Sequence, residues 1–226
     1  MPHLVTFLLA TATHAATPTL DDAALWLNTL GVRADLPRLS VRYGSDVQGS
    51  DTTFRLKSGE VHELLQHAPT VEWEEGAFGT PQHESEKFFL LMLDPDAPAR
   101  ADDGSLSGSA GPWLHWLVAN GKHGSLSTGQ TVVSYMPPDL PETGGTHRYI
   151  FLLFRQLKPG TLSGYVAGPT FRRKWDVAGF LRDNAGALEP VACNFFYATA
   201  ERIGGPMDGA AGRADSGLMP PVKSEL

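Results

Sequence analysis

The sequence predicts a mainly β fold, namely an antiparallel β-sandwich with a few peripheral helices. From Ser40 onward, short β-type runs recur and are separated by Gly, Pro, Asp and Ser, which is typical of strands joined by turns. Two runs, Phe88–Leu93 and Tyr149–Phe154, are continuously apolar, which predicts strands buried on both faces. No alternation of strand and helix patterns is visible, so a parallel βαβ architecture is not expected.

The first expected element is a short amphipathic helix over Leu20–Leu30. Asp21 or Asp22 can cap its start, Gly31 ends it, and its apolar side chains recur at helical spacing. Strands then follow in chain order; their expected ranges are Leu39–Tyr43, Val71–Trp73, Phe88–Leu93, Leu114–Val118, Val132–Tyr135, Tyr149–Phe154 and Val191–Tyr197. A second helix is expected over Phe171–Asn184.

Composition divides the chain into three parts. Residues 1–16 contain the apolar run Leu4–Ala10 and small residues before Pro18, a pattern that resembles a signal peptide although it lacks Lys and Arg. Residues 17–203 form the expected domain, and Gly204–Leu226, without apolar periodicity, is expected to be a disordered tail. If residues 1–16 are a signal peptide that is removed, we expect a secreted protein; if they are retained, we expect a cytoplasmic one.

Charge and cysteine content exclude several classes of function. The net charge of −7 and the absence of a basic stripe argue against nucleic-acid binding, and Arg172–Lys174 is interpreted as a solvated helix start. The single cysteine, Cys193, excludes an internal disulfide and is interpreted as a small buried hydrophobic residue. No apolar stretch of 18 residues occurs, so we expect peripheral membrane contact at most.

Three short polar segments lie beside expected strands and predict one ligand pocket. They are Asp94–Pro98, Trp113–Trp116 and Gly145–Tyr149. In the first, prolines stiffen the backbone around Asp96, and in the second His115 shares a strand face with Trp113. In the third, His147 shares a face with Tyr149, whereas Arg148 faces the other way and is expected to pair with a carboxylate.

Imidazoles, a phenol and carboxylates form a donor and acceptor set that suits a small anion such as a phosphate monoester. Two His and two Asp residues can also bind zinc, but no HxH or HxxxH spacing occurs, so no metal and no cofactor is expected. A serine hydrolase is disfavoured because Leu106 stands at the nucleophile position of the Gly104–Gly108 segment. A small acid and base hydrolase using Asp94, Asp96 and the histidines remains an alternative.

These segments, together with Phe171–Trp175, resemble the signatures of the phosphatidylethanolamine-binding protein family. That family includes the Raf kinase inhibitor proteins and the yeast carboxypeptidase Y inhibitor, and Val191–Ala198 is most similar to the fungal inhibitor branch. The resemblance covers about Leu20 to Glu201. It implies a β-sandwich with a pocket for phosphate-type anions and phospholipid headgroups. The pocket residues that it implies are Asp94, Asp96, Pro98, Trp113, His115, His147 and Tyr149.

The resemblance implies a soluble binding protein without enzymatic activity. Its ligand would be a phosphoryl or carboxylate compound such as phosphoethanolamine, and its partner a serine carboxypeptidase or similar protease that it inhibits. The alternative is a phospholipid-headgroup-binding signalling adaptor without protease inhibition.

The chain departs from the family pattern at Ala99, where a serine is common, and in the segment from Pro137 to Thr143. There two family glycines are replaced by Pro137 and Thr143, and Asp139 and Glu142 add negative charge. We expect this charge to weaken the binding of simple anions. The binding of phosphoethanolamine, which carries an ammonium group, should be weakened less.

Overall fold

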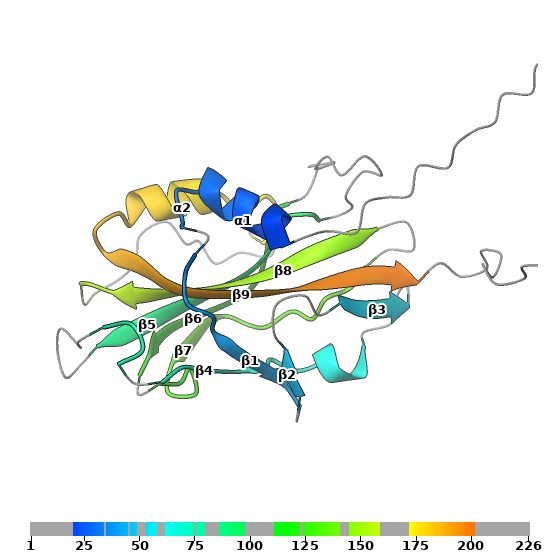
Figure 1. Cartoon of the computed structure of the whole chain (residues 1–226), viewed down its shortest axis with the longest axis horizontal. Helices are drawn as coiled ribbons and strands as arrows, with labels where there is room; N and C mark the ends of the chain where they lie inside the picture. Colours follow the sequence, from blue (N-terminus) through cyan, green and yellow to red (C-terminus); the bar gives the residue numbers. More distant parts are fainter. Residues whose placement is uncertain are drawn as a thin grey trace, which may run out of the picture.

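The computed structural model describes residues 20–33, 35–44, 46–48, 53–57, 62–74, 76–79, 86–97, 111–122, 124–140, 145–158 and 172–201 (Figure 1). The signal-peptide pattern in residues 1–16 and the tail from Gly204 lie outside these ranges, as does the loop from Ala99 except Gly111 and Pro112. Within the described part of the chain, no helix is long and apolar enough to cross a membrane.

Two sheets form the part of the molecule that the structure describes. The larger has six strands in the order β3 (Thr53–Lys57), β9 (Leu188–Glu201), β8 (Thr146–Gln156), β5 (Lys87–Asp94), β6 (Trp113–Gly121) and β7 (Gln130–Val133). The smaller has three, in the order β2 (Asp46–Gln48), β1 (Ser40–Tyr43) and β4 (Thr70–Glu72). All neighbouring strands are antiparallel except β3, which runs parallel to β9.

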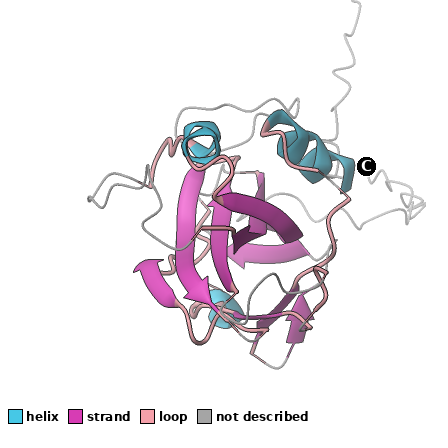
Figure 2. Cartoon of the chain, turned by 90° about the vertical axis from the view of Figure 1, so that its left-hand side faces the viewer, coloured by secondary structure: helices cyan, strands magenta, loops and turns pink. Residues whose placement is uncertain are grey.

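The large sheet lies between the two helices on one side and the small sheet on the other (Figures 1 and 2). Helices α1 (Leu20–Thr29) and α2 (Val177–Asp183) pack on one face, and the small sheet packs on the other. In β5, Phe89, Leu91 and Leu93 belong to the helix side, whereas Phe88, Leu90 and Met92 belong to the sheet side. This alternation explains the continuous apolar runs, and the predicted β-sandwich with peripheral helices is confirmed.

All seven predicted strands and the first helix are present, with ends shifted by a few residues. The prediction did not include β2, β3 or the short 3-10 helix η1 (Glu63–Leu65). In β3, buried Phe54 and Leu56 alternate with polar residues, so the sequence did carry a strand signal there. Cys193 is buried, as predicted, and burial raises the pKa of its thiol.

The prediction of a helix over Phe171–Asn184 was wrong about its start. Helix α2 begins at Val177, because Lys174 has a φ of 51°, in the left-handed region that a right-handed helix excludes. The Asp176 side chain then accepts a hydrogen bond from the backbone N–H of Gly179 and caps the helix.

Candidate functional site

The first polar segment forms a rigid elbow at the end of β5. Asp94 is the last residue of this strand, and its Oδ1 accepts a 2.8 Å hydrogen bond from the backbone N–H of Asp96. The chain entering β6 lies tightly against the elbow, because a Cβ atom on Gly111 would lie 2.5 Å from the carbonyl oxygen of Pro95. The elbow therefore holds the Asp94 carboxylate in one orientation.

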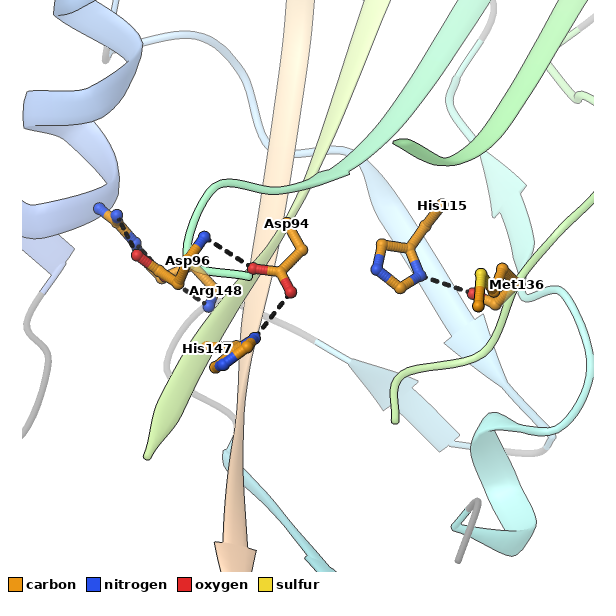
Figure 3. Close-up of polar contacts among 6 residues, drawn as sticks. All are labelled: Asp94, Asp96, His115, Met136, His147 and Arg148. Atoms are coloured by element: carbon orange, nitrogen blue, oxygen red, sulfur yellow. Dashed lines mark hydrogen bonds and ion pairs between the residues drawn. The ribbon is translucent and has the colours of Figure 1, made fainter. Parts of the chain in front are cut away.

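His147, on the neighbouring strand β8, is hydrogen-bonded to this carboxylate. Its Nδ1 lies 2.7 Å from Oδ2 of Asp94, and both side chains are almost completely buried (Figure 3). The two oxygens of Asp94 thus accept from two different groups, the imidazole and the backbone of the elbow. A buried carboxylate needs such partners, and here they also fix the direction of the His147 ring.

Arg148 points to the opposite face of β8, away from His147, and binds Asp96. Nε and Nη2 of Arg148 donate to Oδ2 and Oδ1 of Asp96 at 2.7 and 2.6 Å, and the Arg148 backbone N–H donates to Oδ2 at 2.9 Å. The prediction that Arg148 pairs with a carboxylate is confirmed. Asp96, which the family resemblance places among the pocket residues, does not line the cavity in this structure, because its oxygens face Arg148.

His115 stands at an irregularity in β6. Leu93 of β5 pairs with Leu114 and Met92 pairs with Trp116, so His115 is an extra residue with no partner of its own in this ladder. Such a bulge redirects a side chain locally and is frequent beside functional sites. Because of the bulge, Trp116 joins the small-sheet side of the core while Leu114 belongs to the helix side.

The His115 ring has a defined tautomer. Its Nδ1 lies 2.7 Å from the carbonyl oxygen of Met136, which can only accept, so Nδ1 carries the hydrogen (Figure 3). Burial lowers the pKa of His115, although the Asp94 carboxylate and the Met136 carbonyl partly oppose this shift. His115 is therefore a neutral imidazole at pH 7, with Nε2 as a hydrogen-bond acceptor.

Arg172 fastens the strand that carries His115 to the segment that carries Met136. Its Nη1 donates to the carbonyl oxygens of Leu114 and His115 at 3.0 and 2.9 Å, and its Nη2 donates to that of Ser134 at 2.7 Å. The interpretation of Arg172 as part of a solvated helix start was wrong. No sequence pattern indicates that a side chain will bind three backbone carbonyl groups, so this role of Arg172 could not be predicted from the sequence.

These elements surround a cavity of about 210 Å³. Its lining residues are Asp94, Ala97, Trp113, His115, Met136, Pro137, Asp139 and His147. Four of the seven expected site residues lie on this cavity, namely Asp94, Trp113, His115 and His147. Pro98 lies outside the described residues.

Tyr149 does not line the cavity but supports both histidines from behind. Its ring makes an edge contact with His115 at 5.0 Å between centroids and stacks on His147 at 6.5 Å. Burial raises the pKa of Tyr149 well above 10, and the nearby Asp94 carboxylate adds to the shift, so the phenol stays neutral. Tyr149 thus helps to position the two imidazole rings.

Two further polar side chains, those of Trp113 and Asp139, line the cavity. The indole Nε1 of Trp113 is buried and has no hydrogen-bond partner among the described residues. Asp139 is exposed at the edge of the cavity, where the sequence placed additional negative charge. In the part of the chain that the structure describes, no group of three or more His, Cys, Asp or Glu side chains is arranged to hold a metal ion.

Comparison with known proteins adds two sequence findings. The family model described as "Phosphatidylethanolamine-binding protein" matches residues 37–196. A curated relative, the 26 kDa secreted antigen of Toxocara canis, is 29% identical over 169 residues, which are 72% of this chain and 56% of the relative. The chain therefore spans about half the length of this curated relative.

Solved structures share the fold at low sequence identity. A carboxypeptidase Y inhibitor, crystallised in complex with its cognate proteinase, is similar with a TM-score of 0.62 and 21% identity, over 80% of this chain and 93% of that one. A phosphatidylethanolamine-binding protein from Plasmodium vivax has a TM-score of 0.55 and 18% identity, over 81% and 98% of the two chains. At these identities the similarity concerns the fold alone.

Proposed function

Because the chain belongs to the phosphatidylethanolamine-binding protein family, we propose that its cavity receives the phosphoryl or carboxylate head of a small ligand such as phosphoethanolamine. The observation that carries this proposal is the convergence of His115, His147 and Asp94, from three strands, on one small cavity. Buried polar groups are costly unless they are partnered, and a hydrophobic core does not need them. Their gathering beside an open space therefore indicates recognition of a polar ligand.

The hydrogen-bonding groups of the cavity suit a phosphate monoester. In its monoanionic form, such a group can donate its P–OH to Nε2 of His115 while its other oxygens accept hydrogen bonds. The unpartnered N–H of Trp113 belongs to a lining side chain and is one donor that a ligand oxygen can satisfy. The apolar parts of Trp113, Met136 and Pro137 would cover the organic part of the ligand.

Replacement of His115 tests the proposal. In the H115N variant, the Asn amide can still donate to the Met136 carbonyl, but the acceptor at the Nε2 position is lost. We expect calorimetric titration to show phosphorylethanolamine bound roughly 10- to 150-fold more weakly, since a hydrogen bond to a charged group contributes about 1.5–3 kcal/mol. H115Q, whose amide oxygen reaches toward the Nε2 position, should lose less affinity.

His62 provides a matched control, because it lies outside the cavity beside Phe54. The H62N variant should bind phosphorylethanolamine as tightly as the wild-type protein. If H115N is folded and also binds with wild-type affinity, the proposed site is wrong.

Inhibition of a serine carboxypeptidase is a second candidate function. It rests on the similarity of Val191–Ala198 to the fungal inhibitor branch and on the shared fold with a carboxypeptidase Y inhibitor. Because this segment lies in the buried strand β9, it belongs to the core and supplies no protease-binding surface. An assay of peptide hydrolysis by a serine carboxypeptidase, with and without the protein, tests this function; no change in rate at micromolar protein would dismiss it. The headgroup-binding adaptor without inhibition is the alternative outcome.

We also propose that the protein is secreted after removal of residues 1–16, and that residues 17–203 of the remaining chain form the domain. The apolar run Leu4–Ala10 supports this, as does the relative that is named a secreted antigen. N-terminal sequencing of the native protein should give a start at Ala16 or Thr17. A start at Met1 or Pro2 would instead favour a cytoplasmic protein.

A further inference from the structure

Among the residues that the structure describes, the charged groups of the cavity are not balanced. The described lining residues include two carboxylates, Asp94 and Asp139, and no Lys or Arg. The Asp94 oxygens accept hydrogen bonds from His147 and from the backbone of Asp96, so its charge is stabilised inside the protein. Asp139 differs, because no hydrogen bond or ion pair joins its side chain to the rest of the described chain.

The deep part of the cavity also offers an acceptor. The His115 ring donates from Nδ1 to Met136, and its other nitrogen points away from Met136, toward the side of Asp94 and His147 (Figure 3). A ligand that reaches this nitrogen must therefore donate a hydrogen bond to it. The buried imidazole lies inside, whereas the exposed Asp139 lies at the rim.

This arrangement penalises a simple anion. A phosphate ester that enters the cavity brings negative charge toward the uncompensated carboxylate of Asp139, in surroundings less polar than water. A positive group on the ligand, located toward the rim while the phosphoryl group lies inside, would replace this repulsion by attraction. Phosphoethanolamine has this form, since its ammonium and phosphoryl groups lie at opposite ends of a two-carbon chain.

We propose that Asp139 is a specificity-determining residue that selects ligands carrying an ammonium group beside their phosphoryl group and discriminates against the same anion without the amine. This inference rests on the proposed function, because it assigns the ligand preference of the same cavity.

A pair of ligands of equal size tests the inference. Propyl phosphate replaces the ammonium of phosphorylethanolamine by a methyl group and leaves the phosphoryl group unchanged. By calorimetric titration at low salt, we expect the wild-type protein to bind phosphorylethanolamine at least about threefold more tightly, as for a partly exposed charge pair. D139N should bring the two affinities close together, chiefly by tightening propyl phosphate, and raising the salt concentration should have a similar effect on the wild type.

Asp183, an exposed residue of α2 outside the cavity, gives the matched control. D183N should keep the wild-type preference. Equal affinities for both ligands in the wild type, or the same preference in D139N as in the wild type, would overturn the role of Asp139 while leaving the site in place. If neither ligand binds the wild-type protein, the proposed function itself fails and this inference fails with it.

Discussion

Breaking the buried ion pair between Asp96 and Arg148 should strongly destabilise the protein, and D96N tests this. Both side chains are buried, with 0% and 4% of their surface exposed, and three N–H groups of Arg148 donate to the carboxylate. Asparagine keeps the shape of the side chain but removes its charge and one acceptor. The buried Arg148 guanidinium would then lose the negative charge that it faces.

The expected loss follows from this burial. Removing one partner of a buried ion pair usually costs about 3–5 kcal/mol, because the other charge is left uncompensated. With a urea dependence of about 2 kcal/mol/M, the midpoint of urea unfolding should fall by roughly 1.5–2.5 M. Replacing both partners by uncharged residues, as in D96N/R148M, should cost less than the sum of the two single changes.

Arg33 and Asp35 supply the comparison, since they form a similar pair with about three quarters of each side chain exposed. D35N should leave the urea midpoint unchanged, because exposed ion pairs contribute little. Equal midpoints for D96N and D35N would refute the reasoning that burial gives the Asp96–Arg148 pair its importance.

Three further predictions concern pH, the Arg172 contacts and metal. Burial lowers the pKa of His115 in the folded protein below the value of about 6.5 in the unfolded chain, so the unfolded state binds more protons on acidification. Its contribution to stability is therefore present above about pH 6.5 and is lost as the pH falls, and H115N should show a flatter decline in urea midpoint between roughly pH 7 and 5; parallel declines would contradict this. R172K, with one ammonium in place of a planar fork, cannot bind the same three carbonyls, and we expect phosphorylethanolamine affinity to fall about 3- to 10-fold in calorimetry with the urea midpoint less affected. A chelator should leave the thermal midpoint of the protein unchanged, whereas a drop of many degrees would revive a zinc site.

Residue patterns predicted the fold well where burial was two-sided. The continuous apolar runs identified β5 and β8, the central strands. Within these runs, successive side chains pack alternately into the apolar clusters on the two faces of the sheet, so every residue of a run is apolar. Family membership, expected from the ordered motifs, is confirmed by the family model over residues 37–196. The start of the second helix was predicted too early. Lys174, which precedes the helix, has a left-handed backbone conformation, but it is not a glycine, so the sequence did not indicate this conformation.

The candidate site was only partly accessible from sequence. Strand alternation correctly separated His147 from Arg148, but it could not reveal that Asp96 belongs to Arg148. Alternation also could not predict the bulge at His115, which depends on pairing with Leu93 and Met92 far along the chain. Arg172 binds backbone carbonyl groups, and His115 binds the backbone carbonyl group of Met136. Because every residue has a carbonyl group, only the three-dimensional structure shows which ones are bound.

The position of β9 has a consequence for the order of folding. Strand β9 lies inside the large sheet, and among the described strands β3 pairs only with β9, with Thr53 paired to Tyr197. During synthesis, β3 must therefore wait for almost the whole domain to leave the ribosome, and until then one edge of β8 stays unpaired. Contacts between such distant residues slow folding, and open strand edges invite association. We therefore expect the nascent chain to depend on protection by chaperones until Leu188–Glu201 has been made.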